Sequence, residues 1–314
     1  MTSCSLIDEG RNAKFHLVNI GGEFRPFERS CLFSLAENRT GAKLCSGLDF
    51  LESAIFIFGS EPFSTSMHMK MFPYGSERVA EARFGRAVEL GILSNIAQGA
   101  GYQATQKGLH AAQEFIQAAE ELLSVAQQIP LADMVRINGY LERICQASLT
   151  APEPPLVFGS VQYFKNMHPG KAAPPMRLFV HYFATLDKYR GNSHLASWQH
   201  YGIEGNRWEV LPEVWEGKLN TLDLIYAELE GREIPREEYA SILQDLEGRG
   251  WIKEVSGNYL TTEGGLKLRD EAEALTDRYF FTPWACLSEA EQAELSALAD
   301  ELNAGLEVTK LTSA

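Results

Sequence analysis

Between Arg177 and Ile203 the positions of apolar and polar residues follow two helical periodicities that meet at a short polar break. On each side of this break, residues that can face a core recur at spacings of three and four, which is typical of a helix with one buried face. They are Leu178, Tyr182, Thr185, Leu186 and Tyr189 before the break, and Leu195, Trp198 and Tyr201 after it. The pattern predicts two helices that meet at RGNSH, Arg190 to His194. Gly191 would end the first helix, and Asn192 or Ser193 would cap the second.

Four further helices are predicted in the first half of the chain. The same periodicity, interrupted by Gly and Pro, gives the ranges 44–58, 78–88, 109–128 and 131–149. Residues 1–43 mix short apolar pieces with polar ones and are expected to form a partly ordered extension.

From residue 218 onward the pattern predicts helix, helix, hairpin and helix, an order that is winged-helix-like. The two helices cover 222–229 and 237–247, and the next helix covers 264–278. Between them, WIKEV and YLTT are joined by a turn at 256–258, which predicts a short β-hairpin. A last amphipathic helix covers 288–308.

The predicted fold is therefore mainly α, with a helical N-terminal half and a degenerate winged-helix-like C-terminal module that includes the hairpin. The proline-rich stretch 151–160 is the best domain boundary. It separates a helical domain, 1–150, from a second part, 151–314, that holds the central helical junction, the module and the C-terminal helix. Residues 161–176 are predicted to be a loop that leads into the central helix.

Composition and charge narrow the class of protein. The 314 residues are 45% hydrophobic and 22% charged, as in soluble globular proteins, and no run of about 18 apolar residues predicts a membrane span. The first residues lack the order of a signal peptide, so we expect a cytoplasmic protein with no membrane partner. The five cysteines are scattered and odd in number, which argues against a disulfide framework or a zinc knuckle.

The predicted junction carries the best candidate chemistry. A histidine in the first turn of a helix lies beside the positive end of the helix dipole, which disfavours its protonation. We therefore predict that His194 is a neutral acid or base and that Arg190 holds an anionic or carbonyl group. The predicted ligand-binding residues are Tyr182, Tyr189, Trp198 and His181. The alternative is that His194 is a structural or capping residue.

No other motif indicates a reaction. The sequence has no G-x-G-x-x-G after a strand, no P-loop, no G-x-S-x-G and no H-E-x-x-H. His68, His181 and His194 could form a three-histidine metal site, but ordinary packing of these residues in a core is favoured. No metal is therefore predicted, and the cofactor stays unknown.

Three segments carry a resemblance to a known family. They are RGNSHLA from Arg190, GRGWI from Gly248 and TTEGGLKLRDEAEALTDRYFFTPW from Thr261. Their residues and spacing resemble the SalK-like proteins, a bacterial helix-turn-helix family with an Arg-Gly-Asp-Gly-His-x-Ala segment and a MarR-type winged-helix tail. The match runs from about Met176 to Trp284 and is loose before it. By position it covers Arg190, Gly191, His194, Ala196, Thr276, Asp277, Pro283 and Trp284, whereas Asn192 and Ser193 replace the family's usual Asp and Gly.

The sequence nevertheless disfavours nucleic acid as a partner. A DNA-reading helix-turn-helix places one helix across the backbone and another in the major groove, yet only residues 230–236 separate the two predicted helices, which leaves no room for a middle one. Residues 220–280 also hold seven Lys or Arg against fourteen Asp or Glu, a net charge of −7. Duplex binding depends on neutralising several phosphates, so we expect no tight duplex binding.

Three functions stay open. The favoured one is a protein that binds a small organic ligand between the two halves near RGNSH, and that is an enzyme if it turns this ligand over. The second is a ligand-responsive transcription regulator of winged-helix type, and the third is a dimeric protein-interaction scaffold. We also expect a homodimer, because the helix 288–308 has an apolar stripe, Leu295, Leu298 and Leu302, without an assigned partner.

Overall fold

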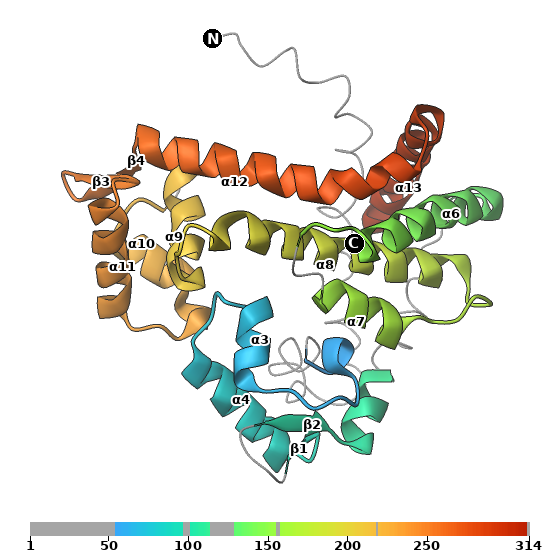
Figure 1. Ribbon diagram of the computed structural model, residues 1–314, viewed down its shortest axis with the longest axis horizontal. Coiled ribbons are helices and arrows are strands. Elements are labelled where there is room, and N and C mark those ends of the chain that lie inside the picture. Colours follow the sequence, from blue (N-terminus) through green and yellow to red (C-terminus); the bar gives the residue numbers. More distant parts are fainter. Residues whose placement is uncertain (1–53, 97–100, 114–128, 155–157, 218, 313–314) are drawn as a thin grey trace.

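Two long helices that lie side by side connect the two ends of the molecule (Figure 1). They are α8 (Pro175–Gln199) and α12 (Glu263–Phe281). The computed structural model describes residues 54–96, 101–113, 129–154, 158–217 and 219–312. The fold is mainly helical, as predicted, with two small antiparallel hairpins, of which the sequence predicted the second.

The predicted break at Arg190 to His194 is wrong, because α8 runs through it as one helix of 25 residues. Gly191 is exposed, and Asn192 and Ser193 are buried in the helix instead of capping a new one. A glycine inside a helix costs about 1 kcal/mol relative to alanine. Packing of α8 against α12 and α7 along its length outweighs this local cost.

At one end, α6 (Leu131–Leu149), α7 (Phe158–Met167) and the N-terminal part of α8 form a first apolar core. The bounds of α6 agree with the predicted helix 131–149. The predicted loop 161–176 is wrong in its first part, because α7 occupies it as far as Met167. Pro174 then precedes α8, whose first residue is Pro175, a position that suits proline because its missing N–H needs no partner there.

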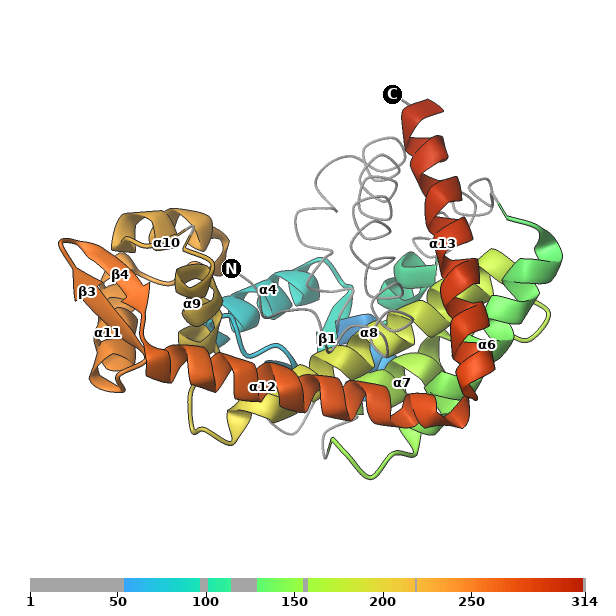
Figure 2. The same cartoon turned by 90° about the horizontal axis from the view of Figure 1, so that it is seen from above.

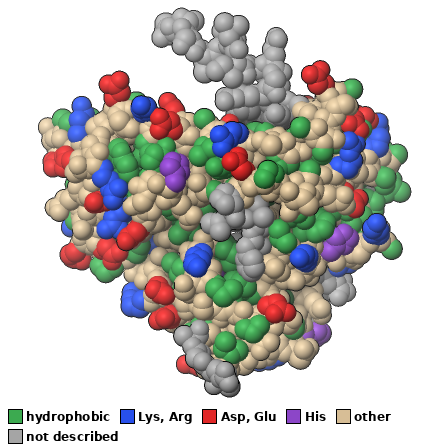
Figure 3. All heavy atoms as spheres, in the orientation of Figure 1, with side chains coloured by type: hydrophobic (Ala, Val, Ile, Leu, Met, Phe, Trp, Pro, Cys, Tyr) green, Lys and Arg blue, Asp and Glu red, His purple; other side chains and the backbone are tan. Residues whose placement is uncertain are grey.

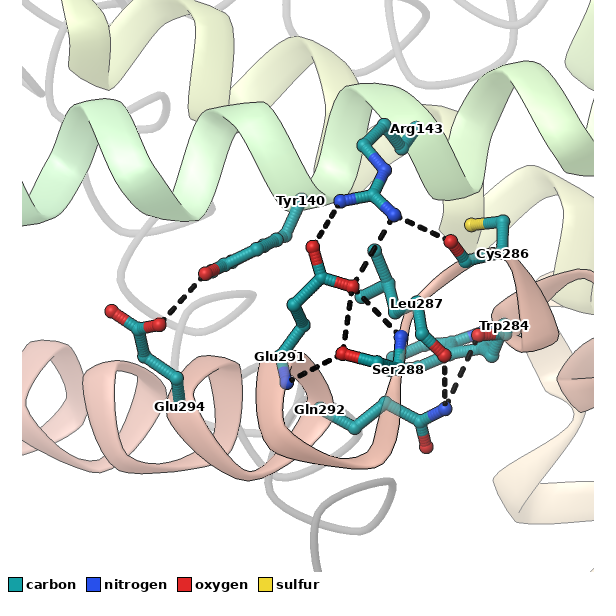
Figure 4. A network of polar contacts seen from close by, with 9 residues as sticks. All are labelled: Tyr140, Arg143, Trp284, Cys286, Leu287, Ser288, Glu291, Gln292 and Glu294. Carbon is teal, nitrogen blue, oxygen red and sulfur yellow. Dashed lines mark hydrogen bonds and ion pairs between the residues drawn. The ribbon is translucent and has the colours of Figure 1, made fainter.

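The C-terminal helix α13 (Glu289–Thr312) lies against α6 (Figure 2). It follows the short 3-10 helix η2 (Thr282–Cys286). Its start is a capping box: the Ser288 N–H donates to the Glu291 carboxylate (2.7 Å), and the Glu291 N–H donates to the Ser288 hydroxyl (3.4 Å). Arg143 of α6 binds the same carboxylate and the Cys286 carbonyl, as Figure 4 shows.

The apolar stripe of α13 is used inside the chain. Leu295, Leu298 and Leu302 are all buried in the first core together with residues of α6. The stripe therefore has a partner within the same chain, and the reason given above for a homodimer does not hold.

A second, smaller layer precedes α6 in the sequence and lies along the lower side of Figure 1. It holds α3 (Thr65–Met71), α4 (Glu77–Glu89) and the hairpin of β1 (Leu93–Asn95) with β2 (Tyr102–Ala104). Phe63 pairs with Tyr102 through two backbone hydrogen bonds of 2.9 and 2.7 Å and so extends the hairpin. The predicted helix 78–88 is confirmed by α4. The predicted helix 44–58 is described only from residue 54, and the helix 109–128 only as far as residue 113.

At the other end, three helices and a hairpin share one apolar core, and together they make the C-terminal module. The helices are α9 (Gly205–Trp215), α10 (Leu222–Glu228) and α11 (Arg236–Gly248), with the 3-10 turn η1 (Glu230–Arg232) before α11. The hairpin pairs β3 (Ile252–Val255) with β4 (Asn258–Thr261), and the Tyr259 N–H donates to the Asn220 carbonyl over 2.7 Å.

This arrangement corrects the expectation that the module has no middle helix. The sequence predicts residues 222–229 as the first helix of the module, whereas in the structure α9 is the first helix and α10, only seven residues long, is the middle one. The predicted hairpin and the helix that follows it are confirmed. The start of α12 packs closely against the residue before β3. Gly265 is needed for this approach, because a Cβ there would lie 2.1 Å from the Trp251 carbonyl oxygen.

Among the residues that the structure describes, no helix is long and apolar enough to cross a membrane. Of the described cysteines, Cys145 is buried and Cys286 is half-buried, and both are free thiols.

Candidate functional site

His194 lies on α8 between the two apolar cores, and both of its ring nitrogens face hydrogen-bonding groups of the chain. The Trp208 indole N–H donates to its Nε2 over 3.1 Å. Because an indole N–H can only donate, Nε2 carries no proton, and the proton of the neutral ring is on Nδ1. Nδ1 lies 3.4 Å from the hydroxyl oxygen of Thr276 on α12. The ring thus joins α9, α8 and α12.

The hydroxyl groups around this ring are paired as well. Thr276 Oγ1 lies 2.8 Å from the Ala272 carbonyl oxygen and 2.9 Å from Ser197 Oγ. The Ser197 hydroxyl donates to the His194 carbonyl over 2.8 Å. We call His194, Ser197, Trp208 and Thr276 the junction network.

Burial, with a smaller contribution from the charge of Arg190, lowers the pKa of His194 to about 4. His194 is therefore neutral at pH 7, as expected, but the cause is different. The helix dipole plays no part, because His194 lies near the C-terminal end of α8 and not in a first turn. Arg190, one turn earlier, is half-buried and has no hydrogen bond or ion pair with another described residue.

The four residues predicted to bind a ligand are not gathered at one place. They lie between positions 181 and 198 of one helix, so the first and last are about 25 Å apart along its axis. Tyr182 and Tyr189 belong to the first core, and Trp198 belongs to the module core, where its ring stacks on Trp208 at 5.3 Å. The Tyr189 hydroxyl donates to the carbonyls of Glu153 (2.9 Å) and Tyr279 (3.1 Å).

His181 is the unusual member of this set. It is only 4% exposed, and neither ring nitrogen has a hydrogen-bond partner among the described residues. Burial, with a smaller effect of His168, lowers its pKa to about 4, so the ring is neutral. The rings of Tyr163, Phe164 and His168 lie 5.9, 5.1 and 4.9 Å from it. An unpartnered buried donor or acceptor costs about 1–3 kcal/mol, so a polar ligand at His181 would remove that cost.

His168 was not among the predicted site residues, because it follows α7 in a stretch taken as a loop and has no helical spacing to His181. The Gly170 N–H donates to its Nδ1 over 3.0 Å, so the neutral ring carries its proton on Nε2. His168 therefore offers a donor and not a metal-binding lone pair. In the described part of the chain no three His, Cys, Asp or Glu side chains are placed to hold a metal ion.

The module presents α11 to solvent. The side chains of Tyr239, Ile242, Leu243 and Leu246 are buried in the module core, as the apolar spacing predicted. Glu237, Ser241, Gln244 and Gly248 are exposed. At 3.6 residues per turn these four positions lie along the side of α11 opposite to the core. We call them the outer stripe of α11.

The arginine side chains of the module are paired with its carboxylates. Arg207 and Arg249 both donate to Asp245, with Nε to oxygen distances of 3.2 and 2.9 Å. Arg236 binds Asp223, and Arg232 binds Glu209. On the face that Figure 3 shows, acidic and basic side chains are interspersed over this end of the molecule.

Residues 76–311 match the model of a family described as a helix-turn-helix family. The match includes α4, both long helices and the whole module. No curated protein matches the chain. No solved structure matches it either.

Proposed function

The chain belongs to this helix-turn-helix family, and from this premise we propose that it is a transcription regulator of the winged-helix type. The observation that carries the proposal is the module itself: α9, α10, α11 and the β3–β4 hairpin share one core and leave the outer stripe of α11 exposed. Proteins of this type place the third helix in the major groove. The finer resemblance, to SalK-like proteins with a MarR-type tail, supports the same function.

Two features of the sequence disfavour duplex DNA as a partner, and the structure removes one of them. The first, a missing middle helix, no longer applies because α10 is present. The second, negative charge, remains: residues 205–262 contain six Lys or Arg and twelve Asp or Glu. Since phosphate contacts dominate affinity, we propose weak binding by each module, with few phosphates neutralised and with specificity supplied by base contacts.

The function is tested with the full chain and sheared genomic DNA of the source organism. The chain is mixed with the fragments at about 50 mM salt, and the bound ones are recovered and sequenced. Two double variants are compared with the parent, and each adds two carboxylates. The first, Ser241→Glu with Gln244→Glu, adds them on the outer stripe. The second, Ala274→Glu with Ala297→Glu, adds them at exposed positions of α12 and α13. We expect the parent and the second variant to enrich the same fragments and the first variant to enrich none. Absence of enrichment by the parent, or unchanged enrichment by the first variant, would refute the function.

We further propose that the regulator responds to a small organic molecule, bound between α7 and α8 at His181 instead of at Arg190 and His194. The ring nitrogens of His194 are engaged within the chain, whereas those of His181 have no described partner. The surrounding rings and the neutral imidazole favour an uncharged planar molecule that both donates and accepts hydrogen bonds.

Phenol and benzamide have this chemistry and serve as probes. Either one should raise the melting temperature of the parent and should have no effect on His181→Phe, which keeps an aromatic ring at this position and removes both nitrogens. The variant itself should melt no lower than the parent, because two unpartnered polar atoms are lost. Equal stabilisation of parent and variant by both probes would exclude His181 as the ligand site.

A further inference from the structure

The outer stripe of α11 differs in chemistry from the rest of the module. It carries one carboxylate, Glu237, near the start of the helix, followed by Ser241, Gln244 and Gly248, which are small or uncharged. Ala240 beside it is also small. A helix with such a stripe can approach the floor of a groove closely, since no long charged side chain holds it away.

The other charges of α11 are directed to the sides. Asp245 accepts from Arg207 and Arg249, and the Asn206 side chain donates to Glu238 over 3.3 Å. The Glu247 carboxylate accepts the Glu254 N–H over 2.8 Å. Arg236 is bound to Asp223. Glu237 and Gln244 therefore remain as the polar groups on α11 with long side chains that point away from the core and have no hydrogen bond to another described residue.

These two side chains match specific base edges in the major groove. A glutamine amide forms two hydrogen bonds with adenine N6 and N7, and a glutamate accepts from cytosine N4. Glu237 and Gln244 are seven residues apart, or about 10.5 Å along the helix, at 1.5 Å per residue. Base pairs rise by about 3.4 Å, so this distance spans about three base-pair steps.

From this placement we propose that α11 reads a C·G pair through Glu237 and an A·T pair about three steps away through Gln244. Ser241 lies between them, and its hydroxyl can donate to an acceptor or accept from a donor, so it adds no strong preference for one base. The proposal rests on the proposed function, because it needs duplex DNA in front of α11. It also gives the carboxylate a role: Glu237 lowers the affinity for every duplex and least so for one that offers a cytosine amino group.

The test is selection of bound duplexes from a random library by the full chain, followed by fluorescence anisotropy with the selected sequence. The selected site should contain C and A about three base-pair steps apart. Gln244→Ala should lose the preference for A. Its affinity for the selected duplex should therefore fall about tenfold or more, whereas its affinity for a duplex in which the A·T pair is replaced should change little. Glu237→Gln should change the preferred C to A and bind all duplexes more tightly, because one negative charge is removed.

The matched controls are Gln106→Ala and Glu289→Gln, at exposed positions outside the module. Both should select the parent's site with unchanged affinity. If the parent selects a site that lacks this pair of bases, or if Gln244→Ala and Glu237→Gln select the parent's site, the base assignment is wrong while the regulator function stands. If the parent selects no sequence at all, both are refuted.

Discussion

The Trp208 indole N–H donates to Nε2 of His194, and this contact holds the first helix of the C-terminal module on the long helix α8. The lone pair that a catalytic base would use is therefore occupied in the folded chain. On the opposite side of the ring, Nδ1 faces Thr276 of α12. The geometry favours a structural role for His194, which links three helices where the two cores meet.

Replacement of His194 by alanine should lower the free energy of unfolding by about 1–3 kcal/mol, because the Trp208 N–H and the Thr276 hydroxyl lose a partner in a partly buried place. Urea unfolding followed by tryptophan fluorescence measures this. His200→Ala, at an exposed position, is the control and should change stability by less than about 0.5 kcal/mol. A His194→Ala variant as stable as the control would show that the junction network contributes no stability.

Stability should fall as the pH is lowered from about 6.5 to 4. Burial lowers the pKa values of His68, His181 and His194 to about 4 from 6.5. In this window the unfolded chain binds protons that the folded chain does not, so unfolding becomes easier with each step down in pH. Each histidine contributes up to about 3 kcal/mol, present in full above pH 6.5.

The matched comparison for this pH dependence is His181→Phe, which removes one of the three groups. Its free energy of unfolding, measured by urea titration at each pH, should decline less steeply than that of the parent between pH 6.5 and 4. Parallel curves for parent and variant would mean that His181 titrates equally in both states.

Two glycines should respond in opposite ways to alanine. A Cβ on Gly205 would lie 2.3 Å from the Pro73 carbonyl oxygen, so Gly205→Ala should separate α9 from the segment before α4 and cost more than about 2 kcal/mol. Gly139, inside α6, has nothing within 4 Å of such a Cβ, and Gly139→Ala should add about 0.5–1 kcal/mol. Thermal melts of both variants check the pair. Equal shifts in the same direction would contradict it.

The capping box of α13 should contribute measurably. Ser288→Ala removes the hydroxyl that accepts from the Glu291 N–H and should cost about 1 kcal/mol. Amide exchange in the first turn of α13 should become faster, while that in α6 should change little. Ser60→Ala is the control, because Ser60 is exposed and its hydroxyl has no hydrogen bond to another described residue. Unchanged exchange in α13 would show that the Ser288 hydroxyl does not stabilise this end of the helix.

We still expect a homodimer, for a reason other than the one drawn from α13. Helix-turn-helix regulators read two half-sites as dimers, and an acidic module with few phosphate contacts needs two to bind well. Light scattering at micromolar concentration should give twice the 35.0 kDa of one chain. A mass of one chain, both free and on a selected duplex, would rule the dimer out.

Local patterns predicted well those elements whose one face is buried against a neighbour close in sequence. The helix at Leu131–Leu149 and the buried face of α11 follow directly from apolar spacing. The junction at Arg190 failed because Gly191 and the polar residues after it imitate a helix end, while packing on α12, distant in sequence, keeps α8 continuous. The β1–β2 hairpin was not predicted, since its strands have only three residues each and depend on Phe63.

The candidate site was predicted only in part, for a related reason. Neutral His194 and buried His181 were singled out by residue type, but their partners Trp208, Thr276 and His168 come from other elements, and no spacing in the sequence relates them. His194, the predicted acid or base, therefore has both ring nitrogens next to hydrogen-bonding groups, whereas His181, predicted only as a ligand contact, has ring nitrogens with no described partner.

Because α8 and α12 each contribute to both cores, the module is not connected to the rest of the molecule by a flexible linker. Tyr189 and Phe280 are buried in the first core, and Leu195 and Leu268 in that of the module. If one core unfolds, α8 and α12 no longer supply their apolar side chains to the other. The two cores should therefore unfold together in one cooperative transition. A protease should not release the module as a folded fragment, because α8 and α12 belong to both cores.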